Sequence, residues 1–547
     1  MPPHGVTAFD AAGILKQNAH QNFTHDFKPG HSYSINVNGN DINAYNEATA
    51  NIQWVIQQAI DNNIRLRAMG SNWALSKVAS ADAIINTKGL NLKFKPGSGW
   101  LSDAYKQSGK TANDVLFVQS GCMIWDLNKF METELSPRRC LRASGGSNGQ
   151  TIAGATATGT HGAAIYTGAV HDAIVGLHIV TGPGSHAWVE RASYPVASDS
   201  FINSIGATAI RNDEMFNAAV VSFGSFGIIH GVMIETEPIY LLSAYANTNN
   251  DKNVVPYTAE LRNALSGLDM NKLRQLLPGF PADTAENKLY HFELAANLNK
   301  LKKENKKEIV VHAYFRQPCP DSYTPVHDYN QSKNTYSKDT MGAVSSIVDS
   351  VGAIALLMPF AVNQLFYAGL RDTSGGPKTI GEVFRYTRFR GRIASAAMAV
   401  DAADALRALD IMIEENKRLT LPGGVAFRYV KGTNATLGFT KFANSCVIEM
   451  DGLDTEKLHE FINRVWTKLE EPSVNIPYTL HWGKFNYILN SQRVRRMYGD
   501  AKVDSWLNCR KQLLNADARR VFTNDFMVQC GLVNTETPPV PPGPIDT

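Results

Sequence analysis

The stretch from residue 144 to residue 162, SGGSNGQTIAGATATGTHG, is made mostly of glycine, alanine, serine and threonine. Glycine lets the backbone approach a ligand and adopt positive φ, while amide N–H groups and hydroxyls in such a run converge as hydrogen-bond donors. Side chains this small are not expected to build a hydrophobic core. The composition is typical of a phosphate cradle, and a small-residue turn packed against a sheet is the open alternative.

Two widespread phosphate-binding motifs are absent from the sequence. It has no G-x-x-x-x-G-K-[ST], the loop that binds nucleoside triphosphates, and no G-x-G-x-x-G between a strand and a helix, the fingerprint of a dinucleotide-binding Rossmann unit. The small-residue run therefore favours a different kind of cofactor site.

Residues 153–162, AGATATGTHG, resemble a motif of the vanillyl-alcohol-oxidase type of FAD enzymes, closest to the alditol and aldonolactone oxidases. Four further segments fit this family in the right order. They are similar to its first flavin loop, the strand-loop beside the flavin, the substrate-side H-W-G/A-K motif and the C-terminal closing segment: residues 67–76 (RAMGSNWALS), 224–229 (GSFGII), 481–484 (HWGK) and 522–526 (FTNDF). The resemblance spans most of the chain.

The resemblance implies that these motifs bind FAD. The expected cofactor residues of the first flavin loop are Arg67, Met69, Gly70, Ser71, Asn72, Trp73 and Ser76. Those of the small-residue run are Ser144, Gly145, Ser147, Asn148, Gln150, Thr151, Gly154, Ala155, Thr158, Gly159, Thr160, His161 and Gly162. The two remaining motifs add Gly227, Ile228, Ile229 and Asn524.

Attachment of the cofactor is expected to be noncovalent. Many members of the resembled family link FAD through a histidine of the first flavin loop, and Trp73 occupies the matching position. His161 is the only histidine in a flavin motif, and its family counterpart packs near the cofactor without bonding to it. A structural histidine is therefore the favoured interpretation of His161.

Flavin oxidation of an alcohol needs a base, hydrogen-bond donors for the substrate oxygen, and a cation or dipole near the reduced ring. The resembled family carries a Glu-x-Arg pair on a substrate-domain strand, and the matching residues here are Ala426-Phe427-Arg428. The arginine is kept and the glutamate is missing. The resemblance implies substrate-binding roles for Arg428, His481 and Lys484, and catalytic roles for Arg428 and Lys484.

Strand periodicity suggests a replacement for the missing glutamate. On the expected strand 425–430, Ala426 and Arg428 share a face, so the alanine leaves a gap beside the arginine. The next expected strand, 445–450, carries Glu449 as its one charged residue among apolar neighbours, and burying a lone carboxylate is costly without a cation. We therefore expect Glu449 to pair with Arg428 and act as a catalytic residue; a solvent-facing Glu449 is the alternative.

Three functions fit these motifs. The first is FAD-dependent oxidation of a CH–OH group of a sugar, polyol or aldonolactone, with oxygen or another acceptor reoxidising the flavin. The second is the same chemistry on a sterol or other lipophilic alcohol. The third is flavin binding with degenerate catalysis, which the missing glutamate favours.

Hydrophobic periodicity places the motifs in an α+β fold. It predicts helices over 48–62, 124–131, 401–416 and 458–469, and strands over 64–68, 115–118, 171–180, 309–315, 425–430 and 445–450. The expected architecture is a two-part FAD-binding domain of the vanillyl-alcohol-oxidase type with a separate α/β substrate (cap) domain. The expected domains are 1–240 for FAD binding, 241–490 for the substrate, and 491–547, which returns to the FAD domain and ends in a proline-rich tail.

Residues 351–370, VGAIALLMPFAVNQLFYAGL, are apolar over nearly the length that spans a bilayer. A spanning helix there would separate the two halves of the flavin site, so that topology is rejected. A buried cap helix is favoured; an apolar wall for a lipophilic substrate and a membrane-surface patch are the alternatives.

The composition is that of a globular enzyme, with 44% hydrophobic and 19% charged residues and a net charge of +3. The sequence has no basic stripe with interleaved aromatic residues, so a nucleic-acid partner is not expected. The six cysteines have no metal-ligand spacing, so reduced thiols and no metal are expected. The N-terminus shows no secretory signal, so the expected location is the cytoplasm.

Overall fold

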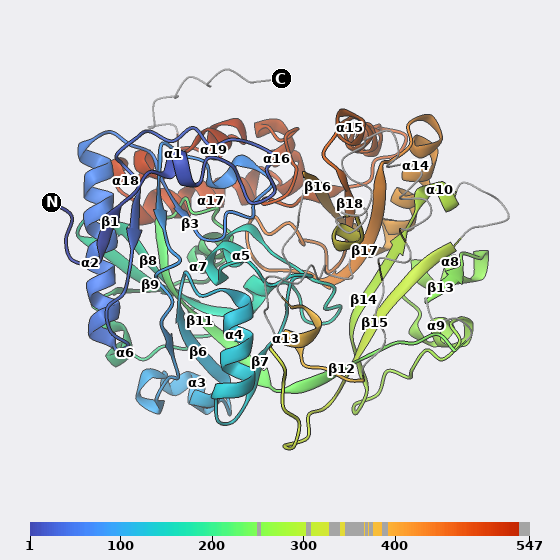
Figure 1. The fold of residues 1–547 in the computed structure, drawn as a ribbon, viewed down its shortest axis with the longest axis horizontal. Helices are drawn as coiled ribbons and strands as arrows, with labels where there is room; N and C mark the ends of the chain where they lie inside the picture. Colours follow the sequence, from blue (N-terminus) through green and yellow to red (C-terminus); the bar gives the residue numbers. More distant parts are fainter. Residues whose placement is uncertain are drawn as a thin grey trace.

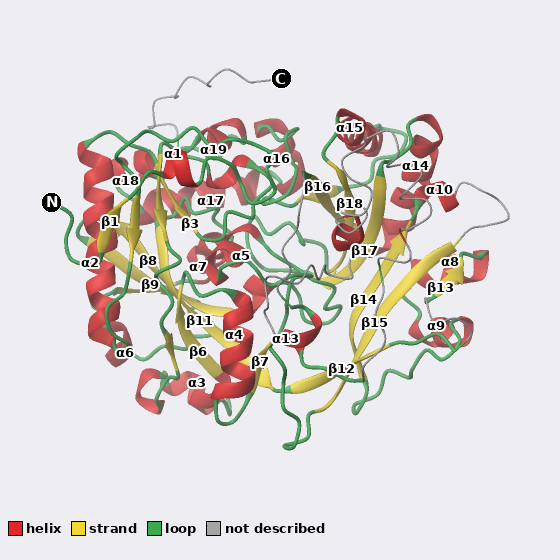
Figure 2. Ribbon diagram, in the orientation of Figure 1, coloured by secondary structure: helices red, strands yellow, loops and turns green. Residues whose placement is uncertain are grey.

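The computed structural model describes residues 1–248, 253–301, 308–327, 340–344, 366, 370, 376–385 and 392–534. Within these residues the strands form three sheets. Two sheets lie in the half of the molecule that contains the N-terminus, and the third lies in the other half (Figure 1, Figure 2). The α+β class predicted from the sequence is confirmed.

The first sheet has the order β1-β2-β4-β3 and carries the first flavin loop at its edge. Its strands are β1 (Val6–Ala8), β2 (Tyr33–Ile35), β4 (Ala83–Asn86) and β3 (Leu66–Met69). Helix α2 (Ile42–Asp61) begins with the Asp41 side chain accepting a hydrogen bond from the Ala44 N–H, so it starts earlier than predicted. Its apolar side chains, including Ile52, Val55 and Ile56, pack against this sheet.

The second sheet has the order β10-β9-β8-β11-β6-β5, with β7 paired to β11. Its strands are β10 (Thr208–Arg211), β9 (Ser185–Glu190), β8 (Ile174–Gly182), β11 (Ile228–Pro238), β6 (Val115–Gln119), β5 (Lys93–Phe94) and β7 (Arg139–Leu141). The small-residue run lies beside it and contains helix α5 (Ile152–Thr158), which ends at Gly159 with φ 78°. Ile152 and Ala155 join the hydrophobic core, so the expectation that this run builds no core is wrong.

The third sheet has the order β12-β15-β14-β17-β18-β16-β19, with β13 paired to β15. Its strands are β12 (Tyr240–Ala244), β15 (Glu308–Pro318), β14 (Lys288–Ala296), β17 (Gly423–Lys431), β18 (Asn444–Leu453), β16 (Ile393–Asp401), β19 (Tyr478–Leu480) and β13 (Val254–Pro256). Phe427 and Ile448 join the core with helices α14 (Ala405–Arg418) and α15 (Glu456–Glu470). Because side chains alternate along a strand, Arg428 and Glu449 lie on the opposite face.

The end of the described chain returns to the first half of the molecule. Helices α16 (Ser491–Tyr498), α17 (Asp500–Leu513), α18 (Ala516–Val521) and α19 (Asp525–Gln529) follow the third sheet. Helix α18 packs on α2, and α17 packs on α7 (Asp213–Val220). Segments far apart in sequence thereby close one unit (Figure 1).

Other helices lie between the strands. These are α1 (Ala11–Ile14), α3 (Asp103–Gln107), α4 (Ile124–Lys129), α6 (Asp199–Ser204), α8 (Ala259–Ser266), α9 (Met270–Leu276), α10 (Leu298–Leu301) and α13 (Ile380–Val383). The predicted helix over 124–131 is α4 followed by a π-helical turn, Phe130–Glu134. The predicted strand over 171–180 begins only at Ile174, after a 3₁₀ turn.

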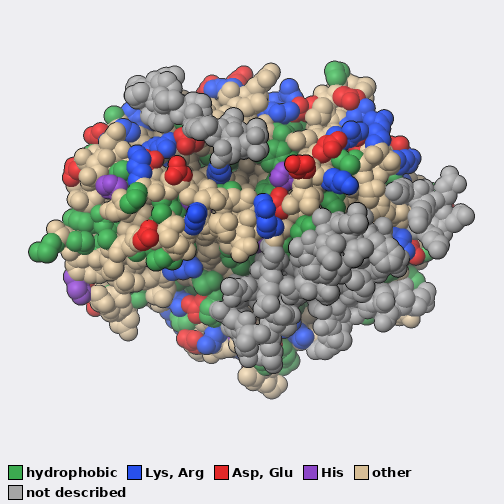
Figure 3. All heavy atoms as spheres, turned by 45° about the horizontal axis from the view of Figure 1, so that its top comes forward, with side chains coloured by type: hydrophobic (Ala, Val, Ile, Leu, Met, Phe, Trp, Pro, Cys, Tyr) green, Lys and Arg blue, Asp and Glu red, His purple; other side chains and the backbone are tan. Residues whose placement is uncertain are grey.

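Two expectations fall largely outside the described residues. The apolar segment 351–370 is described only at Phe366 and Leu370, and the tail 535–547 is not described. None of the helices in the described ranges is long and apolar enough to cross a membrane. On the face drawn in Figure 3, Lys and Arg side chains are interspersed with Asp and Glu side chains.

Candidate active site

A cavity of about 220 Å³ lies where the first flavin loop, the small-residue run and the third sheet meet. The first two contribute residues such as Ser71 and Thr160, and the third sheet contributes Arg428 and Glu449. Elements from both halves of the molecule therefore wall a single cavity.

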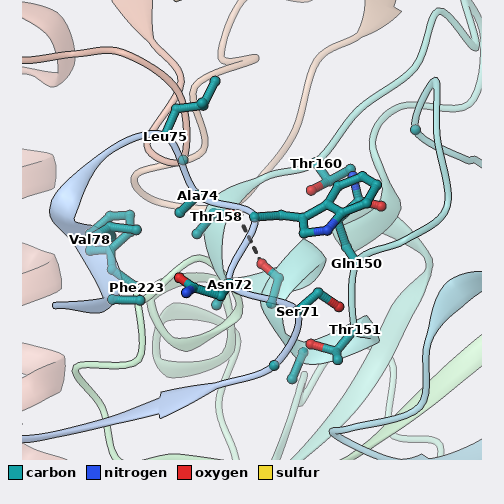
Figure 4. A pocket seen from close by; sticks show the side chains of 18 of the residues that line it. Ser71, Asn72, Ala74, Leu75, Val78, Gln150, Thr151, Thr158, Thr160 and Phe223 are labelled. Carbon is teal, nitrogen blue, oxygen red and sulfur yellow. Dashed lines mark hydrogen bonds between the residues drawn. The ribbon is translucent and has the colours of Figure 1, made fainter. Parts of the chain in front are cut away.

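Most of the expected cofactor residues line this cavity. They are Arg67, Met69, Gly70, Ser71, Asn72, Trp73, Gly145, Ser147, Gln150, Thr151, Gly154, Thr158, Thr160, His161, Gly227 and Ile229. Figure 4 shows side chains of the first flavin loop and of the small-residue run around the same space. Motifs about eighty residues apart in sequence are thus neighbours in the fold.

Eight expected cofactor residues are not among those that line the cavity. They are Ser76, Ser144, Asn148, Ala155, Gly159, Gly162, Ile228 and Asn524. Some of them form hydrogen bonds within the protein: the Ser76 hydroxyl donates to the carbonyl of Trp482 at 2.6 Å, and Ser144 donates to Asn148 at 2.7 Å. Asn524 accepts from the Met527 N–H at the start of α19, so it acts as a helix cap.

The cavity wall carries polar atoms that suit FAD. The Ser71 and Ser120 hydroxyls, Gln150 Oε1 and Arg67 Nε are buried and have no hydrogen-bond partner among the described residues. Buried polar groups normally find partners, and these four line the cavity, so they fit a ligand with both donors and acceptors. FAD, with its phosphates, hydroxyls and flavin ring, is such a ligand.

The charge of Arg67 also fits an anionic cofactor. Its side chain is 1% exposed, and its guanidinium donates to the carbonyl oxygens of Phe522 at 2.6 Å and Gly224 at 3.3 Å. Neutral carbonyls do not compensate its charge, and a buried cation favours a nearby anion. The phosphates of FAD would supply that anion.

The backbone at Gly70 lies very close to Thr151, which positions the first flavin loop against the small-residue run. A Cβ added to Gly70 would lie 2.2 Å from Thr151 Oγ1, which is less than any real contact distance. Gly70 therefore allows the first flavin loop to lie directly against the small-residue run, and Figure 4 shows Ser71 beside Thr151.

Trp73, at the position of the family's linking histidine, lines the cavity together with His20. The two rings meet edge to face, with centroids 5.9 Å apart. Burial, together with the nearby charge of Lys484, lowers the pKa of His20 to about 4. His20 is therefore neutral near pH 7.

The third sheet brings Arg428, Glu449 and Glu293 together on the face opposite the helices. Arg428 Nη1 lies 3.1 Å from Glu449 Oε2, and Arg428 Nε lies 3.6 Å from Glu293 Oε2. Glu449 is 2% exposed and Arg428 is 4% exposed. The predicted contact between Glu449 and Arg428 is confirmed, and the solvent-facing alternative for Glu449 is excluded.

Lys484 joins this cluster from the loop after β19. Its Nζ contacts Glu449 Oε1 and donates to Ser395 Oγ at 2.8 Å. Burial raises the pKa of Glu449, but the charges of Arg428 and Lys484 outweigh that effect and hold its pKa far below the ordinary value. Glu449 is therefore a permanent carboxylate that bridges two cations.

Two histidines complete the cavity wall near Glu449. His161 Nε2 lies 3.8 Å from Glu449 Oε1, while His161 Nδ1 lies 3.0 Å from the Gly162 carbonyl oxygen. His481 Nδ1 accepts a hydrogen bond from the Gly483 N–H at 2.9 Å. Burial lowers the pKa of both rings, that of His161 to about 4. Both are neutral near pH 7 and offer uncharged polar edges to a ligand.

The sequence motifs did not predict several residues that line the cavity, among them His20, Ser120, Phe223 and Met341. Ser120 carried a usable signal, because it follows the buried strand β6 directly and precedes Gly121. His20 and Met341 lie in segments without a motif, so their part in the cavity is visible only in the fold.

The sequences of known proteins match this chain over part of its length. The sequence profile of the D-arabinono-1,4-lactone oxidase family matches residues 393–530, the part that holds Arg428, Glu449 and Lys484. This part of the chain is similar to the D-arabinono-1,4-lactone oxidases. A D-arabinono-1,4-lactone oxidase of Debaryomyces hansenii is 31% identical over 197 residues, which cover 35% of this chain and 31% of the relative.

A second relative is an L-gulono-1,4-lactone dehydrogenase of Mycobacterium tuberculosis, 26% identical over 190 residues, which cover 34% of this chain and 36% of the relative. The chain therefore matches about a third of the length of each of these two relatives.

Solved structures match almost the whole chain. A cholesterol oxidase from Brevibacterium sterolicum superimposes with a TM-score of 0.63 over 97% of this chain and 99% of its own, at 14% identity. A chitooligosaccharide oxidase gives a TM-score of 0.56 over 95% and 96%, at 9% identity. These likenesses establish the fold expected from the motifs, that of the FAD-linked oxidases.

Proposed function

We propose that this protein is an FAD-dependent oxidoreductase that oxidises a CH–OH group of an aldonolactone or a related sugar or polyol. The substrate is a small polar molecule, and oxygen or another acceptor reoxidises the flavin. In this proposal residues 1–240 and 491–547 form the FAD-binding part, and residues 241–490 form the substrate part.

One observation carries the proposal: Glu449 bridges Arg428 and Lys484 on the cavity wall, within the segment matched by the lactone oxidase profile. Part of the cavity lining fits FAD. Arg428, Glu449 and Lys484 line the same cavity and would border the space beside the bound FAD. Charged and hydroxyl-bearing walls favour a ligand rich in hydroxyl groups.

FAD, when bound, would supply an acceptor for the hydride of the substrate carbon. The residues of the chain act on the hydroxyl oxygen bonded to this carbon. Arg428 and protonated Lys484 provide positive charge near it, which stabilises the negative charge on the substrate oxygen once the hydroxyl proton has left. Glu449 keeps both cations in place, because each contacts a different oxygen of one buried carboxylate.

The cofactor in this proposal is held without a covalent bond. Trp73 occupies the place of the family's linking histidine, and a tryptophan indole cannot form that link. Arg67 and the hydroxyl-rich wall supply the noncovalent contacts.

The two alternatives have less support. The match to a cholesterol oxidase concerns the fold alone, at 14% identity, and does not favour a sterol substrate. Degenerate catalysis was suggested by the missing glutamate at Ala426, but Glu449 supplies a carboxylate to Arg428 from the next strand.

Anaerobic flavin reduction tests the proposal directly. The purified yellow protein is mixed with aldonolactones, polyols and a sterol, and the loss of flavin absorbance is followed. Reduction by an aldonolactone or polyol is expected. Reduction by the sterol alone would support the lipophilic alternative, and no reduction by any of them would favour a binding protein.

A further inference from the structure

Asp451 is a second carboxylate behind the Glu449 cluster, and nothing above gives it a role. It lies two residues after Glu449 on β18, so both side chains are on the same face of the sheet. Asp451 is 0% exposed, and its Oδ2 accepts a hydrogen bond from the Thr340 hydroxyl. Its Oδ1 is buried and remains an open acceptor among the described residues.

Ser395 connects Asp451 to Lys484. In the antiparallel pair of β16 and β18, Ser395 is the direct register partner of Asp451. The Ser395 hydroxyl accepts a hydrogen bond from Lys484 Nζ at 2.8 Å, so its own proton is available to an acceptor across the strand pair. Direct cross-strand neighbours have Cβ atoms about 4.5–5.5 Å apart, within reach of a hydroxyl and a carboxylate.

We propose that Lys484, Ser395 and Asp451 form a proton relay in which Asp451 stores the proton removed from the substrate hydroxyl. The proposal rests on the function proposed above. The Lys484 ammonium passes a proton to Ser395 Oγ while Ser395 passes its hydroxyl proton to the Asp451 carboxylate. The neutral Lys484 amine then takes the substrate hydroxyl proton, and the hydride leaves the same substrate for the flavin.

This assignment balances protons and charge. The substrate loses one proton and one hydride and becomes a carbonyl compound. Lys484 and Ser395 end with the protons they began with, and Asp451 changes from carboxylate to carboxylic acid. When the acceptor reoxidises the flavin, the stored proton leaves Asp451 through Ser395 and Lys484 to that acceptor, which thereby gains one hydride and one proton, as oxygen does in forming hydrogen peroxide.

The electrostatics of Asp451 suit a proton store. Burial raises its pKa, the nearby carboxylate of Glu449 raises it further, and Lys484 with the Ser395 and Thr340 hydroxyls lowers it, with a result of about 6. Strand β17 faces Asp451 with Gly424, which does not titrate. Asp451 is therefore ionised above pH 6 yet accepts a proton readily, unlike Glu449.

The pH dependence of anaerobic flavin reduction tests the relay. The wild-type rate is expected to rise with pH through a transition near pH 6, as Asp451 ionises. Asp451→Asn should abolish this transition and lower the plateau rate about ten-fold or more. Thr340→Val, which removes a hydrogen bond to the carboxylate, should move the transition to higher pH. Asp454→Asn, at a nearby half-buried carboxylate outside the relay, is the matched control.

Infrared difference spectroscopy gives a second readout that does not depend on turnover. The band of a protonated carboxyl should grow as the pH falls from about 7.5 to 5, be lost in Asp451→Asn and persist in Asp454→Asn. It should also persist in Ser395→Ala, which interrupts the relay but keeps the store, while the reduction rate falls.

The outcomes separate the relay from the proposed function. Wild-type reduction with an unchanged rate and pH profile in Asp451→Asn overturns the relay alone. Persistence of the titrating band in Asp451→Asn does the same. Failure of the wild type to be reduced by any aldonolactone or polyol overturns the proposed function and the relay with it. Melting temperatures identify variants that fail to fold. If Asp451→Asn fails to fold, the Thr340→Val variant tests the relay: a shift of its pH transition to higher pH supports the relay, and no shift or a shift to lower pH overturns it.

Discussion

Ala426 is the direct register partner of Glu449 in the β17–β18 pair. The position that lacks the family's glutamate therefore faces the residue that supplies a carboxylate. On the other side, Glu449 faces Ala397 of β16. A carboxylate flanked by two alanines has room to reach both Arg428 and Lys484, whereas a second glutamate at position 426 would place two negative charges side by side.

Replacement of Glu449 by Gln should leave FAD bound and slow flavin reduction about ten-fold or more, because the amide cannot anchor two cations by charge. Stopped-flow reduction under anaerobic conditions measures this rate. Glu456→Gln, on the surface at the start of α15, is the matched control. An unchanged reduction rate in Glu449→Gln would end the role assigned to this residue.

Replacement of Lys484 by Met should also lower the rate of flavin reduction about ten-fold or more, equivalent to roughly 1.4 kcal/mol of lost transition-state stabilisation. The side chain keeps its length and loses its charge. Lys502→Met, exposed on α17, should have the wild-type rate. A Lys484→Met variant that changes only in melting temperature would contradict a catalytic role.

Acid precipitation should release all of the flavin into the supernatant, because Trp73 cannot form the histidyl link. Absorbance of the supernatant and of the redissolved pellet measures the two fractions. Free FAD treated in the same way is the control. Colour that stays with the pellet would mean that another side chain holds the cofactor covalently.

Replacement of Gly70 by Ala should weaken FAD binding and destabilise the fold by about 1–3 kcal/mol, because the new methyl group would overlap Thr151. Chemical unfolding and FAD titration of the apoprotein measure the two effects. At Gly97 an added Cβ meets nothing within 4 Å, so Gly97→Ala is the matched control. Equal stabilities of the two variants would contradict the close approach at Gly70.

Stability should fall as the pH drops below about 6.5, because buried histidines are neutral in the folded state. Burial lowers the pKa of His230 to about 3 and that of His20 and His161 to about 4, whereas unfolded histidines titrate near 6.5. The unfolded chain therefore binds protons first, and each such histidine costs up to about 1.4 kcal/mol per pH unit in this window.

Urea unfolding between about pH 7.5 and 5 measures this loss. His230→Gln should lose stability less steeply than the wild type over the acidic part of that range, because one proton fewer is taken up on unfolding. The matched control is His4→Gln, at an exposed position near the N-terminus. Identical slopes for His230→Gln and the wild type would show that His230 is not the group responsible.

The sequence by itself determined the candidate cofactor loops and the faces of the strands. The signal of short motifs such as residues 67–76 and 153–162 is local, because the glycine backbone and the hydroxyl groups that would contact a ligand lie within one short segment. Strand alternation is local too, so the side chains of Ala426 and Arg428 could be assigned to one face from the pattern alone.

Only the tertiary structure decided which residues meet across that face. Register between β16, β17 and β18 is set by packing against α14 and α15 and by the whole sheet, and a shift of one residue would turn Glu449 away from the cavity. The same holds for His20 and for Ser395 and Asp451, which belong to no motif. Their chemistry arises from contacts between distant segments, and no local pattern encodes such contacts.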